Sequence, residues 1–417
     1  MTFGFRMFLL GVVIVLIDLY FYQAILALTK KKSAKKRKKI LYIYWGFTVL
    51  SILILLSPFV FNTANWPRVI KVYVFAIVIL VLFSKIIGSL FIALDDILRL
   101  FRWIGSLFTK KPSEPSTSKN RITRLQFLNY MALGMTAIPL IGLIRGMIKG
   151  AFDFKIHNIK VVLPNLPDSF NGLRIVQISD IHIGSFLSTS PLEKAIEIIL
   201  QQKADIIFIT GDLVNDRTAE INPFMDTLSK IKAPMGVFSI MGNHDYGDYA
   251  KWDSQGEKDK NLQDIIEANA QLGWKLLMNE NVILEKNNSE IVLIGVENWG
   301  GNLHFPKYGN MEKAYRGAEK YPVKLLLSHD PSHWNMEIIE KYKDIDLTFS
   351  GHTHGFQFGI EVPGLKWSPS QYIYKQWAGL YSEGKQQIYV NRGLGFLGYP
   401  GRIGILPEIT VMELHNA

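Results

Sequence analysis

The sequence predicts an α/β domain that is preceded by an α-helical membrane region. Toward the C-terminus, short apolar runs alternate with segments whose apolar residues recur at helical spacing. Toward the N-terminus, three successive apolar segments each have the roughly 20 residues that a membrane-spanning helix needs. The charges divide in the same way. Residues 1–150 hold 21 of the 46 Lys and Arg but only 4 of the 36 Asp and Glu. Residues 151–417 hold the other 25 Lys and Arg and 32 Asp and Glu.

The α/β prediction depends on strand and helix signals that alternate along the chain. The apolar runs that predict strands are 173–179, 205–210, 236–241, 323–328 and 345–350. Helical spacing at 191–203 and 219–230 predicts helices between the first three strands. This order is typical of crossover connections and of a mainly parallel, buried sheet.

Each predicted strand is followed by a short motif with imidazole, carboxylate or amide side chains. The motifs are Asp180-Ile181-His182, Gly211-Asp212, Gly242-Asn243-His244-Asp245, Ser328-His329-Asp330 and Gly351-His352-Thr353-His354. In parallel sheets, ligands bind outside the carboxyl ends of the strands. These side chains suit a pair of divalent metals, and paired metals mostly serve phosphoester hydrolysis. One such motif occurs by chance, but five in order predict a metal site.

The order of the five motifs resembles the calcineurin-like metallophosphoesterase superfamily over residues 157–415. Residues 389–395, with Arg402 and residues 407–409, resemble a membrane-associated bacterial branch of it. That branch includes UDP-diacylglucosamine hydrolases and cell-wall-associated phosphodiesterases. The resemblance implies an αββα sandwich, in which helices flank two mixed sheets, and two bound divalent cations.

The resemblance also assigns the metal ligands. It gives one cation Asp180, His182 and His354, the other Asn243, His329 and His352, and makes Asp212 the bridge between them. A bridging carboxylate offsets the repulsion between two cations, and neutral imidazoles suit manganese, iron or zinc. Metals about 3.5–4 Å apart make water acidic enough to attack phosphorus near neutral pH.

Four further residues are expected to act on the substrate. The resemblance implies that His244 is a donor or general acid at the leaving oxygen and that Asp245 holds it. Arg392 and Arg402 are candidates for binding the phosphate or carboxylate groups of the substrate, because a guanidinium binds such oxygens bidentately. A structural ion pair is the alternative for both arginines.

The predicted membrane spans are 3–28, 40–61 and 69–94. Basic residues lie beside them, with eight Lys or Arg in residues 30–39 and seven in residues 99–124. Cationic loops favour the cytoplasmic side of a membrane. The first and third connections are therefore expected in the cytoplasm, with the N-terminus outside.

A fourth apolar segment, residues 127–148, decides which side the α/β domain faces. It is long enough to cross a membrane, although it contains Asn129, Pro139 and Arg145. Residues 124–128 resemble a twin-arginine export signal with one arginine missing. We expect a fourth span, which places the domain on the outer face of the bacterial cytoplasmic membrane. An amphipathic segment on the cytoplasmic face is the alternative.

Three other sets of residues have open interpretations. Asp18 and Lys85 lie within spans, where they could pair with each other or lie at the interface. Asp330 and His333, close to His329, are candidates for supporting the metal ligands. Five aromatic residues after the last motif could rim an acyl-binding groove, enter the membrane interface or pack at the domain edge. They are Trp367, Tyr372, Tyr374, Trp377 and Tyr381.

The predicted organisation has four parts. Residues 1–95 hold three spans and a basic cytoplasmic loop, 96–126 a basic linker with Pro and Ser, 127–148 the fourth span and 151–417 the phosphoesterase domain. The α/β half is mildly acidic and has no basic run, which argues against nucleic acid as a partner. The chain has no cysteine, which excludes disulfides and thiolate ligands.

The leading prediction is a membrane-anchored enzyme with two divalent metals. It would hydrolyse phosphodiester, phosphomonoester or pyrophosphate bonds of envelope or lipid-linked substrates. One alternative is a UDP-2,3-diacylglucosamine-type pyrophosphohydrolase of lipid A synthesis. Another is a metal-binding pseudoenzyme that senses a ligand. A transporter with an appended domain is disfavoured, because the spans and the polar residues within them are few.

Overall fold

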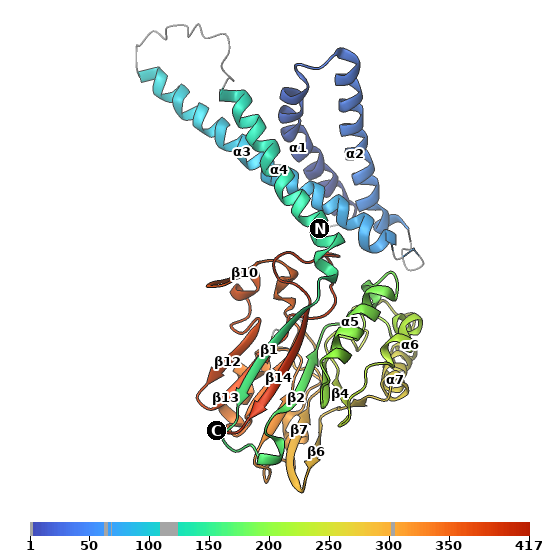
Figure 1. Ribbon diagram of the computed structural model, residues 1–417. Helices are drawn as coiled ribbons and strands as arrows, with labels where there is room; N and C mark the ends of the chain where they lie inside the picture. The colour runs from blue at the N-terminus through green and yellow to red at the C-terminus, as the bar shows by residue number, and fades with distance from the viewer. Residues whose placement is uncertain (1–2, 62–65, 68, 109–123, 302–304) are drawn as a thin grey trace. The chain divides into compact units, whose positions relative to one another are not determined.

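The structure is a computed structural model that describes residues 3–61, 66–67, 69–108, 124–301 and 305–417. The chain divides into two compact units, Met1–Arg145 and Gly146–Ala417. Long helices form the first unit, and strands with shorter helices form the second (Figure 1).

The first unit is built from apolar helices. They are α1 (Phe3–Thr29), α2 (Ala34–Val60), the π-helical turn η1 (Ile70–Val74), α3 (Phe75–Phe108) and α4 (Arg124–Ile148). By length and composition, four segments of the described residues could cross a membrane. These are Leu9–Thr29, Ala34–Val60, Ile70–Phe108 and Tyr130–Phe152. They overlap the three predicted spans and the expected fourth, with bounds that differ.

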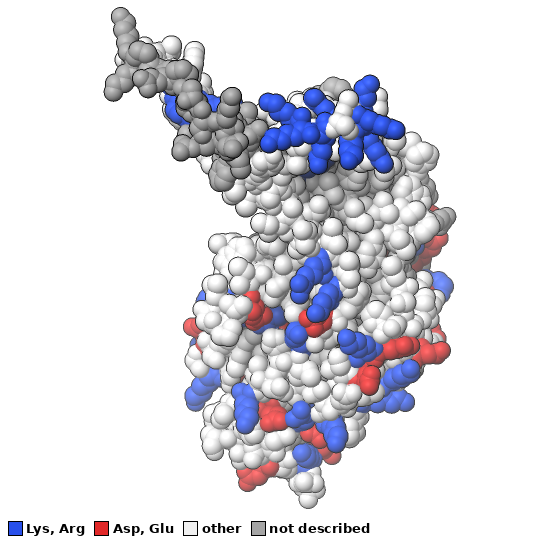
Figure 2. All heavy atoms as spheres, turned by 45° about the horizontal axis from the view of Figure 1, so that its top comes forward, with Lys and Arg blue, Asp and Glu red and all other residues white. Residues whose placement is uncertain are grey.

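Residues 30–39, which comprise the connection after α1 and the start of α2, carry the strongest positive charge of the chain. The basic residues among them are exposed, and Figure 2 shows basic side chains gathered on one face. The other basic stretch differs from the prediction, because α3 continues to Phe108, so that residues 96–108 are helical. This segment is rich in Leu, Ile and Phe, and the chain has no proline there before Pro112. The rest of the predicted linker, residues 109–123, lies outside the described residues.

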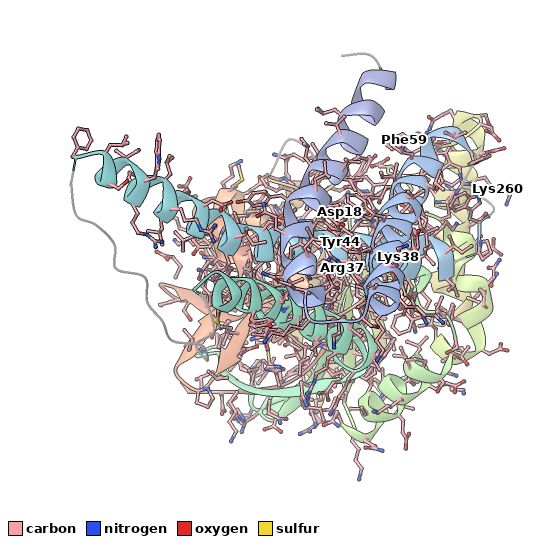
Figure 3. All side chains as sticks on the ribbon, turned by 90° about the horizontal axis from the view of Figure 1, so that it is seen from above. Asp18, Arg37, Lys38, Tyr44, Phe59 and Lys260 are labelled. Carbon is pink, nitrogen blue, oxygen red and sulfur yellow. The ribbon has the colours of Figure 1, made fainter. Side chains whose placement is uncertain are left out.

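Asp18 and Lys85 form a buried ion pair within the helical unit. The Lys85 Nζ lies 2.7 Å from Asp18 Oδ1, and the two residues are 6% and 0% exposed. The Tyr44 hydroxyl donates to the Asp18 carbonyl oxygen at 2.7 Å, and Figure 3 labels both residues. The pairing satisfies a carboxylate that would be costly if it were buried alone.

Two mixed six-stranded sheets form the core of Gly146–Ala417. The first has the order β1-β14-β2-β3-β4-β5, and the second has the order β12-β13-β9-β8-β7-β6. The first sheet contains β1 (Lys155–Val162), β14 (Glu408–His415), β2 (Leu173–Ile178), β3 (Ile206–Thr210), β4 (Val237–Ile240) and β5 (Lys275–Leu276). The second contains β12 (Gly379–Glu383), β13 (Gln386–Val390), β9 (Leu347–Ser350), β8 (Lys324–Leu327), β7 (Ser289–Gly295) and β6 (Glu280–Lys286).

Parallel pairing dominates the centre of both sheets, as the sequence predicts. β2, β3 and β4 pair in parallel, and so do β7, β8, β9 and β13. Antiparallel pairs join β14 to β2, β6 to β7 and β12 to β13. A separate two-stranded sheet consists of β10 (Ile360–Val362) and β11 (Leu365–Trp367).

Three apolar layers hold the sandwich together. The central layer joins the facing surfaces of the two sheets, for example through Phe208 and Phe349. Helices α5 (Ser190–Gln201) and α7 (Gln255–Gln271) cover the other face of the first sheet. The α8 helix (Met311–Tyr315) and the π-helical turn η6 (Trp334–Ile338), which continues into α9 (Ile339–Lys341), cover the second sheet. The four layers are the αββα arrangement that the family resemblance implies.

The second predicted crossover helix is less regular than expected. The 3₁₀-helix η5 (Thr218–Phe224) and the short helix α6 (Met225–Leu228) occupy its place. Pro223 has no N–H to donate, which disfavours a continuous α-helix. The Glu220 carboxylate accepts hydrogen bonds from backbone N–H groups of Asn215 and Arg217 and fixes the entry to this segment.

Candidate metal centre

All seven predicted metal ligands lie in loops at the carboxyl ends of strands. Asp180 and His182 follow β2, Asp212 follows β3, Asn243 follows β4, His329 follows β8, and His352 and His354 follow β9. Loops from both main sheets therefore meet at one place. Six of the seven residues are buried, and His352 is half-buried.

Six of the seven ligands form two compact groups, and the four imidazoles divide between them as the resemblance implied. Asp180, His182 and His354 form one group. Asp212, His329 and His352 form the other. In each group, one potential ligand atom per residue lies within 4.8 Å of the others.

Within each group, nitrogen atoms of two imidazoles face each other. The Nε2 atoms of His182 and His354 are 3.0 Å apart, and the His354 Nε2 lies 3.2 Å from Asp180 Oδ1. The His352 Nδ1 lies 3.2 Å from the His329 Nε2. Two lone pairs that converge at this distance repel each other unless a proton or a cation lies between them, so the arrangement fits a metal ion.

The Asp212 carboxylate joins the two groups. Its Oδ2 lies 3.5 Å from the His182 Nε2 and 3.2 Å from the His329 Nε2. Its Oδ1 accepts a hydrogen bond of 2.9 Å from the backbone N–H of His244. One oxygen is thus held by the backbone while the other faces both groups, which suits a bridging ligand.

Asn243 can complete the second group through its side-chain carbonyl oxygen. Its Nδ2 donates to the Tyr249 hydroxyl at 2.9 Å. Its Oδ1 is buried and has no hydrogen-bond partner among the residues that the structure describes. An unpaired buried carbonyl oxygen is costly, and a divalent cation would satisfy it. The seven residues therefore fit the two divalent metals that the resemblance implied.

Unusual backbone conformations support these positions. Five of the seven residues have positive φ: Asp180 (50°), His182 (45°), Asp212 (56°), His352 (71°) and His354 (50°). A side-chain-bearing residue in this region costs about 1–2 kcal/mol. Such strain persists only where the surroundings enforce it, and it clusters at functional sites.

Two glycines let the loops approach closely. A Cβ at Gly351 would overlap Ser179 Oγ and the Asp180 carboxylate, and one at Gly242 would overlap the Asp212 carboxylate. The glycines of these motifs therefore leave room for the ligand side chains beside them.

Neighbouring acceptors orient the imidazoles. The His329 Nδ1 donates to the Thr210 carbonyl at 2.7 Å, which directs Nε2 toward Asp212. The His352 Nε2 lies 2.8 Å from the Tyr374 hydroxyl and 3.6 Å from Asp330 Oδ2. Asp330 thus lies beside this imidazole, but its Oδ2 makes no hydrogen bond to it.

His333 is engaged away from the ligands. Its ring nitrogens lie 2.8 Å from Ser328 Oγ and 3.2 Å from Glu337 Oε2, and its ring stacks on Trp299. Its neighbours therefore fix it as part of the domain's packing.

Charges within the centre shift the titration of its groups. Burial opposes ionisation of Asp212, but His329 and His244 outweigh it and hold the pKa of this carboxyl well below its usual range. Burial also lowers the pKa of His329, but Asp212 outweighs it and raises that pKa to about 10. Burial lowers the pKa of His352 and His354, which favours the neutral imidazole that a metal requires.

The environment of His244 corrects one expectation. Its Nδ1 donates to the Asn215 carbonyl oxygen at 2.6 Å, so Asn215 holds the ring. Asp245, the expected partner, instead accepts from four backbone N–H groups at 2.8–3.2 Å. They belong to Asp212, Leu213, Val214 and Gly242. Asp245 therefore fixes the loop that carries the bridging carboxylate.

Both arginine candidates are buried within the domain. Arg392 is 3% exposed and pairs with Glu408 and Glu361, each at 2.5 Å. Arg402 is 1% exposed and donates to the Gly395 carbonyl through Nε and Nη2. Arg392 thus forms the structural ion pair that the sequence left open. Arg402 is held by a backbone carbonyl, and its Nη2 lies 3.3 Å from the His354 Nδ1.

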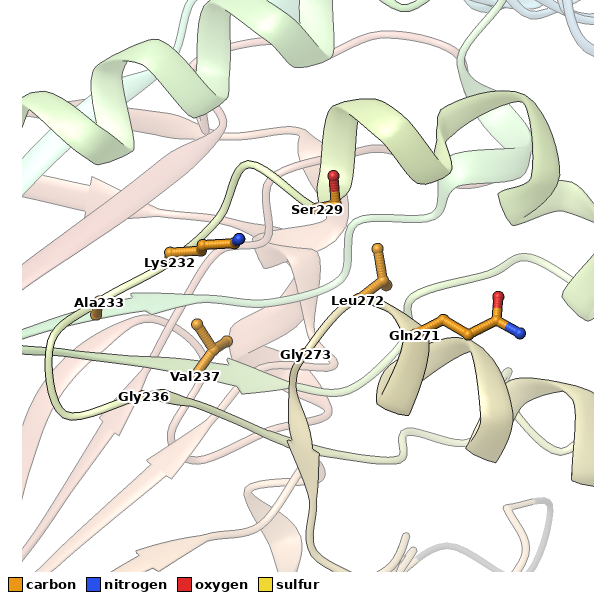
Figure 4. A pocket seen from close by; sticks show the side chains of 8 residues that line it. All are labelled: Ser229, Lys232, Ala233, Gly236, Val237, Gln271, Leu272 and Gly273. Atoms are coloured by element: carbon orange, nitrogen blue, oxygen red, sulfur yellow. The ribbon is translucent and has the colours of Figure 1, made fainter.

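A cavity of about 310 Å³ opens onto the centre. It reaches Asp212, Asn243, His244, His352 and His354. Phe305, Phe356, Ile373, Tyr374 and Leu397 form most of its other walls, so that much of the approach is apolar. A second cavity of about 370 Å³ lies elsewhere, beside Gly236 and Val237 at the amino end of β4 (Figure 4).

The comparisons with known proteins agree with both units. Residues 5–151 match a family described as "Probable Calcineurin-like phosphoesterase, transmembrane domain". Residues 173–356 match the family "Calcineurin-like phosphoesterase", which covers every predicted metal ligand. The chain belongs to the membrane-anchored metallophosphoesterase superfamily. The predicted superfamily and the α/β sandwich are thereby confirmed.

Proteins similar to this chain occur in bacteria and in vertebrates. A "Transmembrane protein with metallophosphoesterase domain" from Danio rerio is 28% identical over 69% of this chain and 62% of its own length. "Uncharacterized metallophosphoesterase YkuE" from Bacillus subtilis is 29% identical over 71% of this chain and 99% of that protein. "Phosphodiesterase YaeI" from Escherichia coli is 27% identical over 70% and 99%. The chain spans about three-fifths of the length of the vertebrate relatives.

Sequence reasoning missed the groups that hold two of the ligands and His244. The Thr210 and Asn215 carbonyl oxygens and the Tyr249 hydroxyl are such groups. Backbone carbonyls leave no signal in a sequence. Tyr249 lies within six residues of Asn243, but tyrosine is common enough that its position alone predicts nothing.

Proposed function

We propose that this chain hydrolyses phosphoesters of envelope or lipid-linked substrates with two divalent cations. The observation that supports this most directly is Asp212, whose Oδ2 faces an imidazole of each ligand group. Cations of manganese, iron or zinc held by the two groups would supply Lewis acidity toward phosphate and lower the pKa of water.

The residues of the chain contribute orientation and proton transfer. The Asn215 carbonyl can only accept, so the His244 Nδ1 carries a proton and its Nε2 is left to exchange one with the leaving oxygen. Burial lowers the pKa of His244, which favours the neutral ring near neutral pH. Asp245 and the backbone N–H of His244 keep the Asp212 carboxylate in place.

We further propose that the phosphoesterase domain faces the outside of the bacterial cytoplasmic membrane. Four spans place the N-terminus and the domain on the same side, and the basic residues at 30–39 favour the cytoplasm for the opposite side. Envelope phosphoesters would then be the available substrates. Protease added to intact spheroplasts should remove the domain. Survival of the domain until lysis would overturn this orientation.

The activity is tested with the full chain in detergent, manganese and bis-p-nitrophenyl phosphate. Wild type should bind two ions and turn over, and Asp212→Ala should lose both properties. His244→Ala should keep its metals and slow by about 10²–10⁴-fold, as for a lost general acid. Asp253→Asn, at an exposed carboxylate, is the matched control.

Two results would contradict the proposal. Turnover of Asp212→Ala at the wild-type rate would show that the centre is not the site of hydrolysis. Two bound ions in wild type without turnover of any phosphodiester, phosphomonoester or UDP-linked pyrophosphate would favour the metal-binding sensor.

A further inference from the structure

The β10–β11 hairpin has an outer face that is unusually apolar. From Phe358 to Val362 every second side chain is exposed: Phe358 by 43%, Ile360 by 47% and Val362 by 54%. The intervening Gly359 is buried and Glu361 is half-buried. Because strand side chains alternate between faces, the exposed face is the hydrophobic one.

The register of the hairpin shows that its second strand shares the apolar outer face. Val362 lies opposite Leu365, which is 51% exposed, so both belong to the outer face. Glu361 lies opposite Lys366, so both side chains leave the hairpin on its other face, where Glu361 is half-buried and Lys366 is exposed. There Glu361 pairs with Arg392, and the Lys366 amine donates to the Ala378 carbonyl oxygen. A hairpin in water normally has the opposite polarity.

The apolar face continues on both sides of the hairpin in chain order. Phe356, Tyr372 and Ile373 are 46%, 76% and 62% exposed. We name the whole set the apolar shelf: Phe356, Phe358, Ile360, Val362, Leu365, Tyr372 and Ile373. Among the described residues of Gly146–Ala417, these are seven of the seventeen exposed large hydrophobic side chains. A concentration of this kind marks an interaction surface.

The shelf begins at the mouth of the metal centre. Phe356 and Ile373 line the cavity that also reaches Asp212 and His244. Phe356 lies two residues after the ligand His354 in the chain. A molecule that enters the cavity would therefore pass along apolar side chains.

The shelf also adjoins the end of a membrane helix. The last residues of α4 belong to the same compact unit as the shelf, and the Gly146 carbonyl accepts from the Arg402 N–H at 3.2 Å. The next residue, Ile403, donates to the Gln357 carbonyl at 2.8 Å and accepts from the Gly359 N–H at 2.9 Å. These residues end the candidate span Tyr130–Phe152, so the shelf lies in the part of the second unit that is hydrogen-bonded to the end of this span.

We propose that the apolar shelf enters the membrane interface and that the substrate is a membrane lipid with a phosphorylated head group. The head group would reach the metal centre through the cavity while the acyl chains stay in the bilayer beside the shelf. Aromatic and aliphatic side chains enter this region readily. The substrate class rests on the proposed phosphoesterase function, whereas insertion of the shelf does not.

Insertion is tested by site-specific fluorescence, for which the absence of native cysteine is an advantage. Ile360→Cys on the shelf and Ile283→Cys on β6 are matched, because the native side chains are 47% and 44% exposed. Each full-chain variant is labelled with an environment-sensitive dye and reconstituted into vesicles that contain spin-labelled phospholipid. The dye at 360 should be quenched several-fold more strongly than the dye at 283. Equal quenching would overturn the insertion.

A second copy of the chain is the other possible occupant of the shelf. In that case the dye at 360 would become shielded with increasing protein concentration in detergent, and vesicles would add no further quenching. That result would also overturn the proposal.

The substrate class is tested with Ile360→Ser/Val362→Ser, because neither residue lines the cavity. Hydrolysis of soluble bis-p-nitrophenyl phosphate should stay at the wild-type rate. Hydrolysis of phospholipid in vesicles should fall about tenfold, because its positioning depends on the shelf. An equal change in both rates would overturn the lipid assignment. A wild type inactive on every substrate, with the dye at 360 still quenched, would instead refute the phosphoesterase function alone.

Discussion

Replacing Asp245 by Asn tests whether this residue supports the loop that carries Asp212 or acts through His244. The structure has its two carboxylate oxygens accepting from four backbone N–H groups. An amide keeps one acceptor oxygen, so two N–H groups would face an NH2 group instead. Each buried donor without a partner costs about 1–3 kcal/mol, which gives a loss of about 2–6 kcal/mol. Even the lower value corresponds to a fall in melting temperature of at least roughly 4 °C.

Tryptophan fluorescence of the full chain in detergent measures this change. Six of its nine tryptophans lie in residues 146–417, so the signal reports mainly on the phosphoesterase domain. Asp253→Asn is the control, because it makes the same chemical change at an exposed position. If Asp245→Asn melts with this control and only turnover falls, Asp245 acts through His244, and the role assigned here is wrong.

Three further perturbations test other parts of the structure. Lys85→Leu leaves Asp18 unpaired and should destabilise the helical unit by about 3–5 kcal/mol. The double variant Asp18→Leu/Lys85→Leu should melt closer to wild type. Equal melting temperatures for both variants would contradict the stabilising role of the ion pair. Arg392→Gln should lower stability most above pH 5. Burial opposes ionisation of Glu408, but Arg392 outweighs it and lowers the pKa of Glu408 to about 2. The ion pair therefore stabilises the fold above the ordinary pKa of 4.5, and this contribution disappears as the pH falls toward 2. A loss of stability that does not depend on pH, measured in EDTA-treated protein, would refute this role of the ion pair. Gly351→Ala should displace Asp180 and reduce bound metal from two ions toward one, while Gly256→Ala keeps both; elemental analysis distinguishes these outcomes.

The sequence was most informative where strands end in polar motifs. The apolar runs before Asp180, Asp212 and His329 predicted buried strands, and parallel sheets bring the carboxyl ends of their strands to one edge. The ligand types then predicted a metal site. The division of ligands between two cations came from the family resemblance, and the distances follow it.

Other features depend on contacts between distant residues. Asp245 is adjacent to His244 in sequence, yet its oxygens point to backbone groups of another loop. The apolar alternation at Phe358, Ile360 and Val362 is typical of a strand with one buried face. Periodicity identifies such a face but does not tell whether protein, water or lipid covers it.

Each ligand group draws on both halves of the sandwich. The first sheet supplies Asp180, His182, Asp212 and Asn243, and the second supplies His329, His352 and His354. Bound cations would therefore act as cross-links between the sheets, and chelation should loosen the seam between them before either sheet unravels. The loops of the two sheets must also keep a fixed distance from each other. A shift of one sheet relative to the other would separate the ligands of both ion sites at the same time.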